Sequence, residues 1–76
     1  MSYTITLKIP ENVTLEETER FATSHRCSVY PNLDIDDFAT NPPRYSHVFK
    51  SESFDCIHEL ASSFLNADAT DLIQKI

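Results

Sequence analysis

Two short runs in this chain place a histidine and a cysteine two positions apart, His25 with Cys27 and Cys56 with His58. Imidazole nitrogens and thiolates are the ligands of tetrahedral zinc sites. Structural zinc ligands are usually separated by two to four residues, whereas a single residue separates each pair here. The second pair also falls in a predicted helix, where residues two apart point in different directions. This spacing therefore disfavours a zinc site.

The same side chains could instead form a cysteine nucleophile, with Cys27 or Cys56 beside His25, His47 or His58. Such a nucleophile needs a neighbouring base or a helix N-terminus to make the thiol reactive. Cys56 lies in the first turn of a predicted helix, which favours this reading, but no loop that would stabilise an oxyanion is evident. A small metal- or thiol-dependent protein is therefore the alternative to the function predicted below.

Glycine is absent from all 76 residues, and this excludes several enzyme classes. Phosphate-binding loops, dinucleotide fingerprints and nucleophile elbows all need glycine where the backbone turns tightly or approaches a ligand. A calcium loop of the EF-hand type needs glycine as well, so the acidic run at Asp34, Asp36 and Asp37 is interpreted as solvated loop charge. We expect a protein that is not an enzyme and that uses no cofactor.

Two segments alternate between apolar and polar residues, as half-buried strands do. In the first, residues 3–9, the apolar positions are odd and Pro10 ends the run; the second spans residues 44–50. A shorter strand is predicted over 27–30. The tail, residues 70–76, fits either an edge strand or a helical turn, and we favour the strand.

Two segments have the spacing of amphipathic helices. The first spans residues 15–25 and begins with a capping box, in which Thr14 is the N-cap and Glu17 the third helical residue. The second spans residues 54–66, and Asn66 suits its end because asparagine tolerates the left-handed conformation. The predicted order is that of an α+β ferredoxin-like βαββαβ sandwich in one domain, residues 1–76, with two helices on one face of a four-stranded antiparallel sheet.

Composition limits the partners of such a domain. The net charge is −6, which disfavours nucleic acid and anionic membranes. RNA-recognition modules of this topology stack bases on aromatic side chains of the open sheet face. In the first and third strands of this chain that face would show Thr4, Thr6 and Lys8 beside Ser46, Val48 and Lys50. We expect no nucleic acid, no membrane and a cytoplasmic location, since the first residues do not resemble a secretory signal.

The function predicted from these exclusions is a small acidic protein-binding or inhibitory module that covers a surface of a larger protein or of a second copy. The composition is that expected of an inhibitor of viral or plasmid origin. We expect the contact surface around the segment from residue 32 to 43, where acidic side chains would meet a basic partner and aromatic side chains would anchor it. The predicted contact residues are Tyr30, Asp34, Asp36, Asp37, Phe38 and Tyr45.

Overall fold

Two long strands form the centre of the sheet in the computed structural model, which describes residues 1–31 and 41–76. β1 (Tyr3–Pro10) and β3 (Arg44–Ser51) pair antiparallel along their whole length, from Tyr3 opposite Ser51 to Pro10 opposite Arg44. Their alternation separates the two faces, because neighbouring side chains of a strand point to opposite sides. The odd-numbered residues face the helices, and Ile5 is only 2% exposed.

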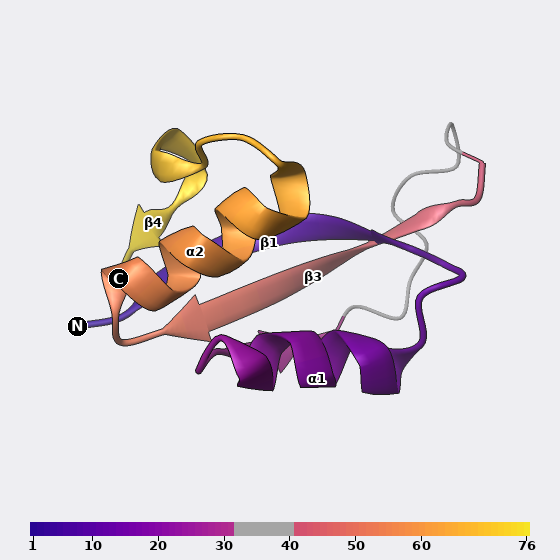
Figure 1. Ribbon diagram of the computed structural model, residues 1–76, viewed down its shortest axis with the longest axis horizontal. Helices are drawn as coiled ribbons and strands as arrows, with labels where there is room; N and C mark the ends of the chain where they lie inside the picture. The colour runs from indigo at the N-terminus through magenta and orange to yellow at the C-terminus, as the bar shows by residue number, and fades with distance from the viewer. Residues whose placement is uncertain (32–40) are drawn as a thin grey trace.

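Two short strands complete the sheet at its edges. β2 (Ser28–Tyr30) pairs with β3, and β4 (Gln74–Lys75) pairs with β1, so the order is β2-β3-β1-β4 with antiparallel neighbours throughout. Both helices pack on one face of this sheet (Figure 1). The predicted ferredoxin-like α+β fold is confirmed.

The first helix, α1 (Leu15–Ser24), starts at the predicted capping box. The Glu17 N–H donates to Thr14 Oγ1 at 3.1 Å, and the Thr14 hydroxyl lies 3.0 Å from the Glu17 carboxylate. The first of these bonds satisfies one backbone donor that the first turn would otherwise leave open, the Glu17 N–H, and the second joins the two side chains. The helix buries only Thr18 and Ala22, and the Thr18 hydroxyl donates to the Thr14 carbonyl at 3.0 Å.

The second helix, α2 (Phe54–Leu65), is more apolar. Ser53 is its N-cap, with the Cys56 N–H donating to Ser53 Oγ at 3.4 Å. Asn66 ends it in the left-handed conformation, at φ 55°, as predicted. Its buried residues are Ile57, Leu60 and Ala61, and they meet the core between the two layers.

The core is built around Phe49, which is fully buried on β3. Phe21 of α1 meets its ring edge-on, with centroids 6.3 Å apart, and also contacts Phe64 of α2. Aromatic pairs in this arrangement add about 0.5–1.5 kcal/mol to the area they bury. This cluster joins α1, β3 and α2, so one aromatic residue per element fixes the three together.

The structure departs from the sequence-based expectations at two places. The tail is divided, with a 3-10 turn at Thr70–Leu72 before the two-residue β4, so the strand predicted over 70–76 is correct only at its end. Arg26, between α1 and β2, takes a left-handed conformation at φ 58° that the sequence did not indicate. Within the described part of the chain, no helix has the length and apolar character needed to span a bilayer.

Candidate functional site

The helices of the described chain pack on one face of the sheet and leave the other face without a helix. We call this other face the open sheet face. The strand register places Lys8 opposite Ser46, Thr6 opposite Val48, and Thr4 opposite Lys50 on it. From β2, Ser28 lies opposite Lys50, and Tyr30 lies opposite Val48. These even-numbered positions confirm the predicted assignment of the two faces.

Tyr30 is the aromatic residue that β2 adds to the open sheet face. Its side chain is 56% exposed, and its register partner Val48 is half-buried. Our prediction of this face used only the first and third strands, and so it missed an aromatic there. The signal was present, because Tyr30 follows Ser28 at the spacing of one strand face. The face that a three-residue strand presents is nevertheless set by its pairing with β3.

The predicted contact residues do not all come together. Tyr45 lies opposite Ile9, on the helix-covered side of β3, where it stacks on His47 with ring centroids 6.3 Å apart. The two tyrosines therefore point to opposite faces of the sheet and do not share one surface. The other predicted residues, Asp34, Asp36, Asp37 and Phe38, lie outside the residues that the structure describes.

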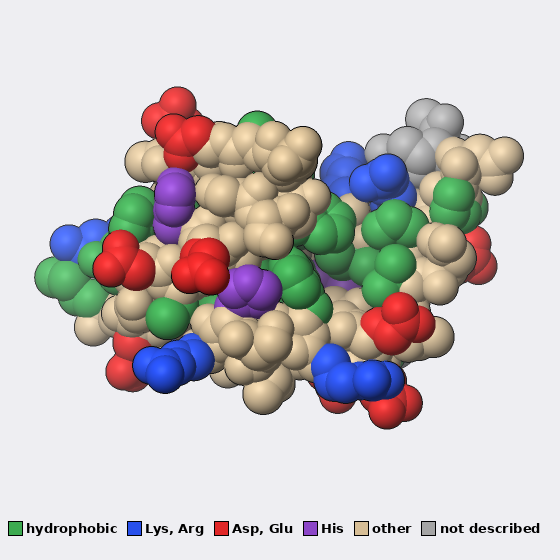
Figure 2. All heavy atoms as spheres, in the orientation of Figure 1, with side chains coloured by type: hydrophobic (Ala, Val, Ile, Leu, Met, Phe, Trp, Pro, Cys, Tyr) green, Lys and Arg blue, Asp and Glu red, His purple; other side chains and the backbone are tan. Residues whose placement is uncertain are grey.

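Charge is divided between the two sides of the described chain. Every described Asp and Glu lies in a helix or in a connection between elements, and no described strand contains one. Figure 2 shows the helix side, where acidic side chains are spread over the surface. The charged residues that the described strands place on the open sheet face are Lys8, Arg44 and Lys50. A protein with a net charge of −6 thus has one cationic face.

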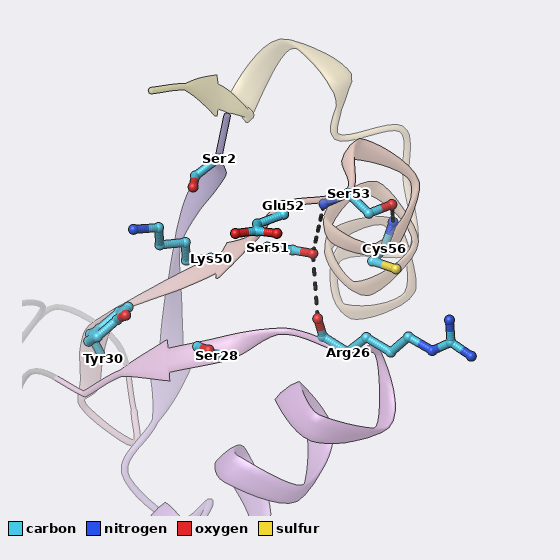
Figure 3. Close-up of a pocket in the computed structure, with 9 residues that line it drawn as sticks. All are labelled: Ser2, Arg26, Ser28, Tyr30, Lys50, Ser51, Glu52, Ser53 and Cys56. Atoms are coloured by element: carbon cyan, nitrogen blue, oxygen red, sulfur yellow. Dashed lines mark hydrogen bonds between the residues drawn. The ribbon is translucent and has the colours of Figure 1, made fainter.

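A cleft of about 540 Å³ adjoins this face where β2 and α2 begin. Figure 3 shows Tyr30 and Lys50 at one end of the cleft, and Arg26 and Cys56 at the other. Ser51 lies between these two ends. Its hydroxyl donates to the Arg26 carbonyl at 3.4 Å and accepts from the Ser53 N–H at 3.1 Å. The full lining is Ser2, Arg26, Ser28, Tyr30, Lys50, Ser51, Glu52, Ser53 and Cys56.

The two cysteines are both free thiols, and they differ in exposure. Cys27 is buried, and its thiol lies 3.3 Å from the His25 carbonyl, to which it donates. Burial raises the pKa of the Cys27 thiol, the nearby Cys56 raises it further, and a hydrogen bond with Ser51 acts in the opposite direction. Cys56 is half-buried and opens to the cleft.

The histidines and cysteines of the two short runs do not assemble into a metal site. Among residues 1–31 and 41–76, no three His, Cys, Asp or Glu side chains are grouped so that they could hold a metal ion. The imidazole of His25 is directed to its own helix, with Nδ1 3.1 Å from the Phe21 carbonyl. The imidazole of His58 contacts the Asp68 carboxylate instead.

A Ser–His–Asp grouping that the sequence reasoning missed lies at the end of α2. His58 Nε2 is 3.0 Å from Asp68 Oδ1 and 3.5 Å from Ser62 Oγ. A catalytic triad needs the acid on one ring nitrogen and the hydroxyl on the other. Here the acid and the hydroxyl share Nε2, so Asp68 competes with Ser62 and does not activate it. Only the i, i+4 spacing of His58 and Ser62 could have been found in the sequence.

Asp68 has a structural role instead. Its Oδ1 accepts from the Thr70 hydroxyl at 2.6 Å and from the Thr70 N–H at 3.1 Å, at the start of the 3-10 turn. The Thr70 hydroxyl is the largest cause that lowers the pKa of this carboxyl, to about 2, followed by the hydrogen bond with His58. The group therefore fixes the turn that leads into β4.

The described geometry thus offers two features that could act on another molecule. One is an exposed tyrosine on a cationic sheet face, and the other is the half-buried thiol of Cys56 in the adjoining cleft, with the second thiol, Cys27, buried in the core. Comparison with protein-family models, with curated proteins and with solved structures finds no significant match, so the function has to be argued from this geometry alone.

Proposed function

We propose that this protein is a small non-enzymatic protein-binding module, which acts by covering a surface of a larger protein with its open sheet face. The observation that carries the proposal is Tyr30, a large aromatic side chain that is 56% exposed on an edge strand. Tyrosine is enriched among the residues that dominate protein interfaces, because it buries a large rigid surface and retains a polar tip.

The surroundings of Tyr30 suit such an anchor. Val48 lies beside it in register, and Thr6 lies beside Val48 on the next strand, so one row across the sheet is flat and only weakly polar. Near-neutral residues around an anchor exclude water from it when a partner docks. Short edge strands also offer backbone groups to a partner.

The charge of the face indicates the partner. Lys50 is next to the tyrosine row, and Arg44 follows on the same face of β3. A basic patch on the partner would complement the acidic run that begins at Asp34. That run lies outside the described residues. The described residues favour an acidic patch on the partner, because complementary charge steers association and suppresses wrong partners.

The test compares two charge reversals, Lys50→Glu on the open sheet face and Arg20→Glu on α1, together with Tyr30→Ser. A protein captured from the native host lysate would be purified, and its affinity for each variant would be measured by calorimetry. We expect Tyr30→Ser to weaken binding about 30-fold, as for a hot-spot residue. We also expect Lys50→Glu to weaken binding more than Arg20→Glu, whose side chain is 73% exposed in the wild type.

Far-UV circular dichroism of each variant separates a binding defect from unfolding. Equal affinity of Tyr30→Ser and the wild type would overturn the proposed surface. If Arg20→Glu is the only variant that loses binding, the contact surface lies on the helix side of the protein. If the captured protein is a second copy of this chain, sedimentation equilibrium of the same variants gives the comparison.

A further inference from the structure

The two thiols are far apart in sequence but belong to one packed region, since Cys27 is part of the buried core and Cys56 packs against that core. Arg26 and Cys56 line the cleft at the end of the sheet, and both also line a second cleft of about 240 Å³ at the end of α1. Cys56 therefore shares the lining of both clefts with the residue that directly precedes Cys27. Figure 3 shows the Arg26 side chain extending past Cys56 from the turn between α1 and β2.

A chain of hydrogen bonds fixes this arrangement. The Cys56 N–H donates to Ser53 Oγ, the Ser53 N–H donates to Ser51 Oγ, and the Ser51 hydroxyl donates to the Arg26 carbonyl. These three bonds connect the first turn of α2 to the residue before Cys27. Burial, and after it the charge of Cys56, raise the pKa of the Cys27 thiol, in keeping with this arrangement.

The two thiols differ in access. Cys56 is half-buried and lines both clefts. Cys27 is 8% exposed and lies behind the wall of the cleft. This is the arrangement of an attacking thiol and a resolving thiol, in which exposure decides the order of the steps.

From this geometry we infer that Cys56 and Cys27 form a thiol–disulfide exchange site whose substrate is a small disulfide such as oxidised glutathione. The Cys56 thiolate attacks one sulfur of the disulfide, which forms a mixed disulfide on Cys56 and releases the first small thiolate. The Cys27 thiolate then attacks Cys56 Sγ, forms the Cys27–Cys56 bond and releases the second. Both protein thiols are oxidised, the small disulfide is reduced to two thiols, and these thiols take up the two protons.

The product would join the turn after α1 to the first turn of α2. A disulfide that closes a chain loop of this kind stabilises the fold when its geometry is unstrained. Formation of the bond would thus convert two separately held elements into one covalent unit. The inference does not depend on the proposed binding function, because it uses other residues and another reaction.

The experiment incubates reduced native protein with oxidised glutathione and follows intact mass, together with peptide mapping. We expect wild-type protein to lose two hydrogens without an adduct, with Cys27 and Cys56 cross-linked. Cys27→Ser should instead accumulate one glutathione on Cys56, and native Cys56→Ser should not react. A stable glutathione adduct on wild-type Cys56, or equally fast modification of Cys27 in Cys56→Ser, would overturn the inference.

A second measurement uses only the wild-type protein, so its result does not depend on whether a variant folds. The melting temperature of the oxidised wild type should exceed that of the reduced wild type by at least about 5 °C, and dithiothreitol should reverse the difference. A melting temperature that is unchanged or lower after oxidation would show that the fold does not hold the two sulfurs in place for a bond.

Discussion

The two faces of the sheet are made by the same two strands, yet they have opposite characters. Phe49 and Val48 are neighbours on β3; Phe49 is fully buried, whereas Val48 is half-buried on the open sheet face. On β1, Leu7 is 3% exposed and its neighbours Thr6 and Lys8 are exposed. The period of two along each strand is enough to produce this division.

The comparison shows where stability resides in this fold and which surface is left for the proposed recognition. The covered face holds the large apolar side chains on which α1 and α2 pack. The open sheet face has few of them, and its charged residues within the described chain are cationic. Substitutions on the open sheet face can therefore change a binding surface while the covered face keeps the fold intact.

The largest expected effect tests this division with a matched pair on β3. Phe49→Ala should lower the free energy of unfolding by about 3–5 kcal/mol, because it removes a fully buried ring from the core. Val48→Ala should lower it by less than about 1 kcal/mol, since that side chain is only partly buried. Urea denaturation followed by circular dichroism measures both. Similar losses from the two variants would mean that the open sheet face is also part of the core.

A smaller effect is expected where α1 passes to the strand that carries Tyr30. Arg26 has φ 58°, in the left-handed region, which is unfavourable for most residues other than glycine. Asn66 has φ 55°, but asparagine is one of the residue types that tolerate this region. We expect Arg26→Gly to stabilise the protein by about 0.5–1 kcal/mol, and Asn66→Gly by less. Urea midpoints give both values. A larger gain at Asn66 than at Arg26 would contradict this explanation.

The smallest expected effect on stability concerns the exposed carboxylate of Asp68, which fixes the 3-10 turn before β4. The pKa of Asp68 is lowered from 3.8 to about 2, so its ionised form stabilises the folded state. That contribution is complete above about pH 5 and is lost as the pH falls from about 5 to 2. Asp68→Asn should therefore lower the melting temperature slightly at pH 6, and the difference from wild type should shrink over that range.

Thermal melts at pH 6, 4, 3 and 2 provide the measurement for both proteins. Thr70→Val is the matched variant, because it removes the hydroxyl that is the largest cause of the shift while the carboxyl remains. A difference that persists unchanged down to pH 2 would assign the effect to a group other than Asp68.

Local patterns in the sequence predicted those parts of the fold that local physics determines. The alternation of Ile5, Leu7 and Ile9 gave the face of β1, and the pairing of Thr14 with Glu17 gave the start of α1. Asn66 marked the end of α2 because its side chain suits the left-handed conformation. Each of these features depends on residues within one turn or one strand.

The site could not be predicted in the same way, because it depends on pairing between distant elements. The face of Tyr30 is set by its register with Val48, and the contact of His58 with Asp68 spans ten residues. Nothing in the chemistry of Arg26 signals its backbone conformation. The contribution of Asp34, Asp36, Asp37 and Phe38 stays a prediction, since these residues lie outside the described ones.

The cleft at the end of the sheet has Tyr30 at one end and Cys56 at the other, with Ser51 between them. A coupling between two events at one shared wall acts equally in both directions. If closing the thiol pair changes a partner's affinity by some factor, the bound partner must change the equilibrium for closing the pair by the same factor. The midpoint potential of the thiols, measured with and without the partner, would then report the coupling between the two ends of the cleft.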